Sequence, residues 1–244
     1  MNTKELAFKV REDIDNNIYS FGETIPSERE LATRYEINRA SVKTAIDTLV
    51  YEGYLYKIRG SGTYVIKNDN KNLQIKFKGL SDLLEQEGIH PSSRIIALEV
   101  KQAGYHVGKL LQIKESEMVF HLLRLRSGDN IPISLENTYI PYSLVKNIEN
   151  YNFQLFSLYS ILAAHNYQID QIFQTISNTK VRNNEASLLD VDEGTSGISL
   201  CISAKTTTGL IVEYTTVTVL AEYASIYTKN FQKGLNTKIY AQID

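Results

Sequence analysis

The chain has 244 residues, of which 43% are hydrophobic and 22% are charged, and its formal net charge is −2. This balance is typical of a globular protein with one large domain or two ordinary ones, and it excludes a largely disordered chain. The net charge gives no general attraction to a polyanion, so any binding to nucleic acid requires a local basic face.

We expect neither a membrane span nor a secretory signal. The longest uncharged run, residues 150–169, contains asparagine, glutamine, serine and histidine side chains that make insertion into a bilayer costly. Lys4, Glu5 and Lys9 interrupt the first residues and leave no apolar stretch for a signal. The single cysteine, Cys201, excludes an internal disulfide and fits a reducing cytoplasm, where we expect the protein to reside.

The first 53 residues predict three helices. Leu6, Val10, Ile14 and Ile18 lie four apart, which gives one apolar stripe on a helix over residues 4–19. Pro26 is followed by the capping box Ser-Glu-Arg-Glu at residues 27–30, which predicts a short second helix over residues 28–35. A third helix follows to about residue 52, with Asn38 as its N-cap.

Two β-prone runs, residues 54–58 and 63–66, flank a Gly-Ser-Gly tip at residues 60–62 and predict a hairpin. Three helices followed by a hairpin are the plan of a winged helix-turn-helix, which we assign to residues 1–67. The polar, non-periodic stretch at residues 68–77 is the predicted linker.

Residues 78–244 predict a larger domain with a mainly antiparallel sheet, so the whole chain belongs to the α+β class. Its expected helices are residues 81–87, 106–111, 157–165 and 183–189. Its expected strands are residues 94–100, 118–126, 131–140, 167–181, 199–207 and 211–220.

The start of the third helix is the candidate DNA-binding surface, since such a helix places its N-terminal residues at base edges in the major groove. We expect Arg39 to bind guanine through O6 and N7, and Ser41 and Lys43 to contact phosphates. Further contacts are expected from Asn38, from Arg29 in the second helix, and from Arg59 and Gly60 at the hairpin tip.

The local charge supports this surface only modestly. Residues 37–66 hold four basic and two acidic side chains, whereas residues 1–36 hold five basic and eight acidic ones. The alternative is that these charges are solvated side chains of a protein-docking module, because helix-turn-helix shapes also occur without DNA.

Arg124 and Arg126 are the candidate ligand-binding residues of the second domain. They alternate on a predicted strand, so both guanidinium groups lie on one face, where burial is costly unless an anion neutralises them. The alternative is structural, with Glu136 or Glu213 on neighbouring strands supplying the counter-charge.

Two further groups are candidate hydrogen-bond donors to an anion. Ser81 begins a predicted helix and could hold an anion at its N-terminus, or it could serve only as an N-cap. Ser157 and Tyr159 begin another helix, where the alternative roles are a cap and a core tyrosine.

The stretch IPSERELATRYEINRASVKTAIDTLVYEGYLYKIRGSGTYV, residues 25–65, resembles the DNA-binding domain of GntR-type bacterial repressors. The matching elements are PSERELA, the arginine at the start of the third helix, the AxxxL spacing before EG, and the RGxGT wing. The resemblance implies that the residues at the operator are Arg29, Asn38, Arg39, Ser41, Lys43 and Gly60.

Residues 78–231 resemble the UTRA effector domain of the HutC subfamily, which has a chorismate-lyase-like fold. The similar stretches are GLSDLLEQEG, RLRSGDNIPISLENTYIP, SLY and GLIVEYTT. The resemblance implies that an anionic group of the ligand is held by Ser81, Arg124 and Arg126 with help from Ser157. It also implies that Glu136, Tyr159 and Glu213 contact the remainder of a small anionic metabolite, such as a sugar phosphate.

No catalytic arrangement accompanies these motifs. The four histidines are scattered without metal-ligand spacing, and neither a Walker loop nor a nucleophile elbow is present. We therefore expect a ligand-responsive DNA-binding regulator, with repression favoured, that needs no cofactor or metal and binds a palindromic operator as a homodimer. The alternatives are a second domain that only dimerises, an activator, and an enzyme fused to a DNA-binding domain.

Overall fold

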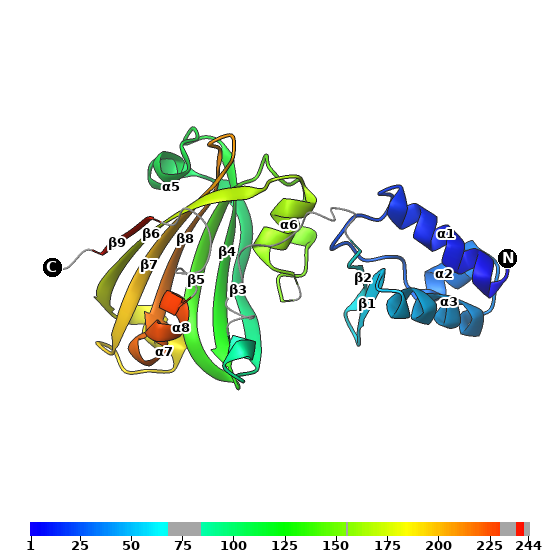
Figure 1. Cartoon of the computed structure of the whole chain (residues 1–244), viewed down its shortest axis with the longest axis horizontal. Helices are drawn as coiled ribbons and strands as arrows, with labels where there is room; N and C mark the ends of the chain where they lie inside the picture. Colours follow the sequence, from blue (N-terminus) through cyan, green and yellow to red (C-terminus); the bar gives the residue numbers. More distant parts are fainter. Residues whose placement is uncertain (68–83, 155, 230–237, 242–244) are drawn as a thin grey trace. The chain divides into compact units, whose positions relative to one another are not determined.

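The computed structural model describes residues 1–67, 84–154, 156–229 and 238–241. The chain divides into two compact units, residues 1–74 with 150–152 and residues 75–149 with 153–244. Figure 1 shows the first as a small helical unit (blue and cyan) and the second as a large curved sheet with short helices. The predicted linker and Ser81 lie outside the described residues.

The first unit contains three helices, α1 (Thr3–Asp15), α2 (Glu28–Arg34) and α3 (Arg39–Tyr51). Each begins at a side chain that satisfies a backbone N–H group left unpaired at a helix start. Asn2 and Ser27 form capping boxes at α1 and α2. At α3, Asn38 Oδ1 accepts from the Ser41 amide at 2.8 Å. The predicted starts of the second and third helices are thus confirmed.

The predicted hairpin consists of β1 (Leu55–Ile58) and β2 (Gly62–Val65), which pair antiparallel. Gly53, at φ +77°, makes the left-handed turn between α3 and β1. On the other side of β2, Thr24 forms an isolated bridge with Tyr64, so the segment before α2 also pairs with the hairpin. This pairing holds the wing against the helical part of the unit.

One apolar core joins the three helices to the wing, and its buried members include Leu6, Val10, Ile14, Leu31, Val42, Ile46, Leu49, Leu55 and Val65. The prediction that Ile18 continues the stripe of the first helix is wrong. α1 ends at Asp15, Asn17 has a φ of 56°, and Ile18 is 62% exposed. Because a left-handed residue ends a helix, the four-residue spacing no longer places Ile18 on the buried side.

The second unit is built on a seven-stranded sheet in the order β3-β4-β5-β8-β7-β6-β9 within the described residues. The strands are β3 (Pro91–Gln102), β4 (Met118–Gly128), β5 (Ile131–Pro141), β6 (Ile169–Lys180), β7 (Ser196–Thr206), β8 (Ile211–Leu220) and β9 (Lys238–Ala241). Neighbours pair antiparallel, except that β9 runs parallel to β6. The mainly antiparallel sheet is confirmed, and β9 has no counterpart among the predicted strands.

Short helices cover both faces of this sheet: α5 (Gly104–Leu111), α6 (Leu158–Ala164), α7 (Asn183–Leu189) and α8 (Ala224–Lys229), with 3-10 turns η1 (Ile148–Asn150) and η2 (Ala221–Tyr223). α8 packs on the face that carries Leu200 and Val217, which we call the α8 face. α5 and α7 pack on the opposite face, against Val119 and Leu125. The helix predicted at residues 81–87 is described only at residues 84–86, which are helical.

The capping box at Ser27 predicts a measurable contribution to stability. We expect Ser27→Ala to lower the free energy of unfolding of the N-terminal unit by about 1 kcal/mol, because the Glu30 amide loses its acceptor. Chemical denaturation followed by circular dichroism would measure this. Ser27→Asp is the matched control and should keep wild-type stability, since aspartate caps as well as serine; equal losses in both variants would contradict the capping role.

Candidate functional sites

The first candidate site is the exposed start of α3. Arg39 and Lys43 are exposed, and Ser41 is half-buried with its backbone amide bonded to the Asn38 cap. Arg29, in the first turn of α2, is also exposed. The caps fix where the two helices begin, and so they fix the backbone from which these side chains extend.

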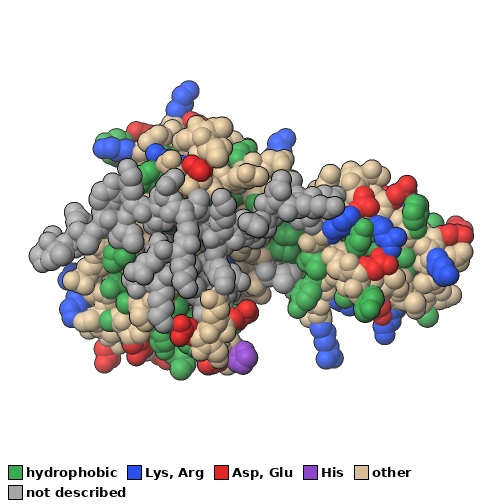
Figure 2. All heavy atoms as spheres, viewed as in Figure 1, with side chains coloured by type: hydrophobic (Ala, Val, Ile, Leu, Met, Phe, Trp, Pro, Cys, Tyr) green, Lys and Arg blue, Asp and Glu red, His purple; other side chains and the backbone are tan. Residues whose placement is uncertain are grey.

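The cations of this unit fall into two groups. Lys57 lies 2.7 Å from Glu28 and 3.3 Å from Asp47, so its charge is neutralised within the unit. Arg29, Arg39, Lys43 and Arg59 have no acidic partner among the described residues. Figure 2 shows Lys and Arg side chains (blue) of this unit lying singly among acidic ones (red) on the face in view. The positive charge of these side chains therefore does not form a broad basic surface on that face.

The tip of the wing adds Arg59 and Gly60, both exposed. Gly60 has a φ of +80°, and a Cβ atom there would meet no other atom within 4 Å. Behind the tip, the Ser61 and Tyr64 hydroxyls lie 2.7 Å apart and tie the turn to β2. The tip is thus an ordered turn, and its backbone at Gly60 is accessible to a macromolecular partner.

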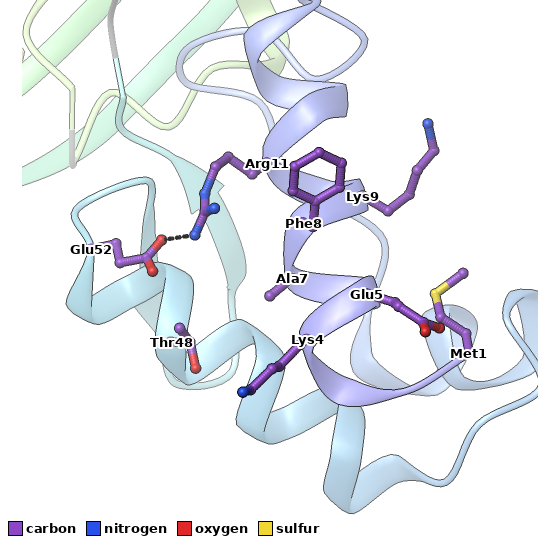
Figure 3. Close-up of a pocket in the computed structure, with 9 residues that line it drawn as sticks. All are labelled: Met1, Lys4, Glu5, Ala7, Phe8, Lys9, Arg11, Thr48 and Glu52. Carbon is purple, nitrogen blue, oxygen red and sulfur yellow. Dashed lines mark hydrogen bonds and ion pairs between the residues drawn. The ribbon is translucent and has the colours of Figure 1, made fainter.

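A separate hollow lies along α1 at the opposite end of α3 from Arg39 (Figure 3). Phe8 projects into it with 58% of its surface exposed. An ion pair between Arg11 and Glu52 closes one side, and Lys9 pairs with Asp13 at 3.1 Å. Because Thr48 lies in the last turn of α3 and Glu52 is the C-cap of that helix, this hollow is no part of the first candidate site.

The second candidate site is a charge cluster on the α8 face of the sheet. Arg124 on β4 and Glu136 on β5 are register partners. The Arg124 Nε and Nη2 atoms donate to Glu136 Oε2 at 3.0 and 2.6 Å, and Nη1 donates to the Phe153 carbonyl at 3.2 Å. The two side chains are only 13% and 14% exposed, so this ion pair is largely shielded from water.

Arg126 joins the same cluster from two residues along β4. Its side chain is 7% exposed, its Nε lies 3.8 Å from Glu136 Oε1, and its Nη1 donates to the Ser93 hydroxyl. The sequence left open whether Glu136 or Glu213 would face the arginines, and in the structure Glu136 lies against both. Burial acts to raise the pKa of Glu136, but the positive charges of the two arginines outweigh it and hold this pKa below its usual range.

Glu213 on β8 lies beside Arg124 and Glu136, and its environment raises its pKa, whereas the pKa of Glu136 is lowered. It is 5% exposed, Thr215 donates to its Oε1, and the Tyr159 hydroxyl is within hydrogen-bonding reach of its carboxyl group. Burial raises the pKa of Glu213, and the neighbouring Glu136 carboxylate raises it further. Burial and the adjacent Glu213 carboxylate likewise raise the pKa of Tyr159 well above its usual value.

The charge balance of the cluster follows from these pKa directions. Two guanidinium groups lie against the single carboxylate of Glu136, whose pKa is lowered, while burial raises the pKa of the neighbouring Glu213. Protonation of Glu213 would leave a buried positive surplus, together with a carboxyl group able to donate or accept a hydrogen bond. A small anion that also carries hydroxyl groups would satisfy both features.

Of the other predicted ligand residues, Ser157 is the N-cap of α6, and its exposed hydroxyl accepts from the Ser160 amide at 3.1 Å. Ser81 lies outside the described residues. The prediction missed Thr138 and Thr215, buried hydroxyls 2.9 Å apart on the same face as Glu136 and Glu213. Alternation would have indicated them, because each follows its glutamate by two residues on a strand.

A winged helix followed by a separate sheet domain is the arrangement of a DNA-binding transcriptional regulator. Comparison with known families agrees: residues 2–65 match the bacterial regulatory proteins of the gntR family, and residues 86–224 match the UTRA domain. The chain belongs to this family of transcriptional regulators, and not to a family of enzymes. No helix among the described residues is long and apolar enough to cross a membrane.

Individual relatives fit this assignment. The chain is 29% identical over 187 residues to the HTH-type transcriptional regulator YurK of Bacillus subtilis, covering 76% of this chain and 77% of YurK. It is 27% identical over 180 residues to the "Probable fructoselysine utilization operon transcriptional repressor" of Escherichia coli K12, covering 74% and 69% of the two chains. The crystal structure of PhnF from Mycobacterium smegmatis, 17% identical, matches 100% of this chain and 99% of its own with a TM-score of 0.57, which supports the fold.

The raised pKa of Glu213 predicts how stability depends on pH. A group with a raised folded-state pKa stabilises most below its unfolded value of 4.5, and this contribution is lost as the pH rises through the folded value. Because glutamine cannot ionise, we expect Glu213→Gln to raise the melting temperature of the sheet unit more at pH 8 than at pH 5. Each pKa unit corresponds to about 1.4 kcal/mol.

Calorimetry at the two pH values would measure this difference. Glu136→Gln is the control of opposite sign: the ionised form of Glu136 stabilises the fold above its unfolded pKa, so this variant should be less stable than the wild type at both values. A benefit of Glu213→Gln that is equal at pH 5 and pH 8 would show that Glu213 does not titrate abnormally.

Proposed function

We propose that the chain is a repressor whose C-terminal domain binds a small anionic metabolite, such as a sugar phosphate, and thereby changes the affinity of its winged helix for operator DNA. The observation that carries this proposal is the buried cluster on the α8 face. Arg124 and Arg126, both largely buried, share the single carboxylate of Glu136. Burying two cations with only one carboxylate costs free energy. An anionic ligand would supply the second counter-charge.

The proposed ligand places its anionic group against the two arginines and its hydroxyl groups near Glu213 and Tyr159. Ser81 and Ser157 are the proposed additional donors to the anion. A sugar phosphate has this combination of charge and hydroxyl groups. The name of the E. coli relative, which refers to fructoselysine utilization, is consistent with a sugar-derived effector.

The proposed DNA contacts come from the cations that have no acidic partner among the described residues. Arg39 would bind guanine in the major groove, and Ser41 and Lys43 would contact phosphates. Asn38 and Arg29 would lie beside them. Arg59 and Gly60 would bring the wing tip to the adjacent groove or backbone, where the absence of a Gly60 side chain permits close approach.

The proposed domain organisation is a DNA-binding domain at residues 1–67, a linker at 68–77 and an effector and dimerisation domain at 78–244. A palindromic operator requires two DNA-binding domains, so a homodimer is part of the proposal. Effector binding would favour one arrangement of the dimer and change the spacing of the two winged helices. A coupling free energy of about 1–3 kcal/mol would change operator affinity about 5–150-fold.

A second candidate is a C-terminal domain that only dimerises. The contact of both arginines with Glu136 favours it, because that carboxylate already supplies part of the counter-charge. The two candidates differ in their response to metabolites, since only the first predicts that a small anion binds and alters DNA affinity.

The two kinds of DNA contact predict different effects of Arg39→Ala and Lys43→Ala. Loss of Arg39 should reduce the free energy of binding to the operator duplex by about 1–3 kcal/mol and relax the base preference at one position. Loss of Lys43 should weaken all duplexes alike and reduce the slope of log K against log salt by about 1. Fluorescence anisotropy on operator and generic duplexes at several salt concentrations would measure both effects.

Lys57→Ala is the matched control for Lys43→Ala, because Lys57 is already paired with Glu28 and Asp47. It should leave the salt slope unchanged. A slope that falls equally in both variants would contradict the phosphate contact of Lys43, and a uniform loss of affinity in Arg39→Ala would contradict its contact with guanine.

The effector proposal predicts that Arg124→Lys keeps operator binding but loses the ligand response. Lysine keeps the charge that Glu136 requires but cannot form the two-pronged contact of a guanidinium. At 100 times its dissociation constant, a ligand adds about 2.7 kcal/mol, or roughly 5–10 °C in melting temperature for a chain of this size. Thermal unfolding against sugar phosphates and small organic acids would identify a ligand that shifts the wild type but not the variant.

Arg94→Lys is the matched control, since Arg94 is an exposed arginine on β3 outside the cluster. It should respond as the wild type does. A wild-type protein whose operator binding and melting temperature ignore every compound in the panel would favour the dimerisation candidate.

A further inference from the structure

Gln174 is a buried polar side chain that none of the interactions described above involves. It lies in the middle of β6, is 1% exposed, and both Oε1 and Nε2 of its carboxamide are without a hydrogen-bond partner among the described residues. By contrast, Thr138 and Thr215 on the same face bond to each other, and Ser134 bonds to Tyr227. Gln174 is therefore unusual even among the buried polar residues of this sheet.

The fold offers no stabilising reason for a carboxamide at this position. A buried donor or acceptor without a partner loses its hydration and gains nothing in return. The nearest residues on the same face of β6, Ile172 and Ile176, are both aliphatic. A leucine or methionine would fill the same space without that penalty, so a bound group is the natural partner of Gln174.

The strand registers place Gln174 on the face that carries the charge cluster. Gln174 is opposite Ile202 on β7, and Ile202 is opposite Thr215 on β8, so all three point to the α8 face. Thr215 in turn bonds to Glu213. On β7, the residue opposite Glu213 is Ala204, whose side chain is a single methyl group.

The distance between Gln174 and the charge cluster limits which part of a ligand could contact Gln174. Neighbouring strands lie about 4.8 Å apart, so β6 is about 10 Å from β8, which carries Glu213, and about 19 Å from β4, which carries the arginines, before side-chain reach is counted. Inorganic phosphate or a small acid held at Arg124 cannot also contact Gln174. A longer ligand can, with its uncharged end at β6.

We propose that Gln174 is a specificity-determining residue of the effector site, where its carboxamide binds the uncharged polar end of an elongated anionic ligand. This inference rests on the effector function proposed above. A carboxamide both donates and accepts, which matches a pair of sugar hydroxyls or an amide. A site built to bond a hydroxyl strongly disfavours analogues that lack it, so Gln174 would select the sugar end while the arginines select the anion.

The first test is the stability of the ligand-free protein. We expect Gln174→Met to raise the melting temperature of the sheet unit by about 2–4 °C, because it removes two unsatisfied polar groups at similar volume. The matched control is Gln171→Met, which changes the same residue type on the same strand but on the opposite face and should have little effect. A lower melting temperature for Gln174→Met would overturn the proposal, since it would show a structural partner such as a buried water.

The second test separates the two ends of the ligand by calorimetric titration with inorganic phosphate, glucose 6-phosphate and maltose 6-phosphate. We expect Gln174→Met to weaken maltose 6-phosphate about tenfold or more, as the loss of two ordinary hydrogen bonds implies, and to leave phosphate affinity unchanged. Arg124→Lys should weaken all three probes.

The outcomes distinguish this inference from the function on which it rests. Equal binding of maltose 6-phosphate by the wild type and Gln174→Met, or equal weakening of maltose 6-phosphate and phosphate, would overturn the role of Gln174 alone. A wild-type protein that binds none of the three probes would overturn the anionic effector site and with it this assignment.

Discussion

The contact of Arg124 and Arg126 with Glu136 is the constraint on which the C-terminal unit depends. Antiparallel pairing of β4 with β5 places Arg124 directly opposite Glu136, and alternation brings Arg126 to the same face. Burial of two cations with one carboxylate is a poor way to stabilise a sheet, because desolvation offsets much of the attraction. The two arginines lower the pKa of Glu136, whereas burial raises the pKa of the neighbouring Glu213.

The two faces of the sheet differ in the side chains that they bury. The face under α5 and α7 packs apolar clusters around Val119 and Leu125, whereas the α8 face holds the charge cluster and most of the buried polar groups. Mounting those groups on paired strands fixes their backbone, which a loop would not. An apolar cluster around Leu200 and Val217 still packs beside them on the α8 face, so this face contributes to the fold as well. Polar groups that bring little stability can be kept there because their neighbours supply it.

Local chemistry made the N-terminal unit predictable, whereas part of the second site depends on contacts between distant segments. The capping box at Ser27 and the cap at Asn38 each depend on about four consecutive residues, so they can be recognised in the sequence, and both are present in the structure. The prediction for Ile18 is wrong because the four-residue apolar spacing continues beyond Asn17, although α1 has already ended and Asn17 is in a left-handed conformation. Alternation indicated that Arg124 and Arg126 share a face but could not choose between Glu136 and Glu213. Gln174 gave no signal at all, because its environment depends on the order β8-β7-β6, which follows from pairing between segments far apart in the chain.

The two candidate sites differ in what an unpaired polar group can tell about function. Arg39 and Lys43 are exposed, so water hydrates their charges at little cost and the absence of an acidic partner is weak evidence by itself. Their proposed role in DNA binding rests on their place at the start of α3 and on the family to which the chain belongs. The Gln174 carboxamide is buried, so the absence of a hydrogen-bond partner among the described residues has a real cost in free energy. Unsatisfied groups are therefore a stronger indication of a ligand on the α8 face than of DNA at α3, even though the family resemblance is easier to recognise in the winged helix.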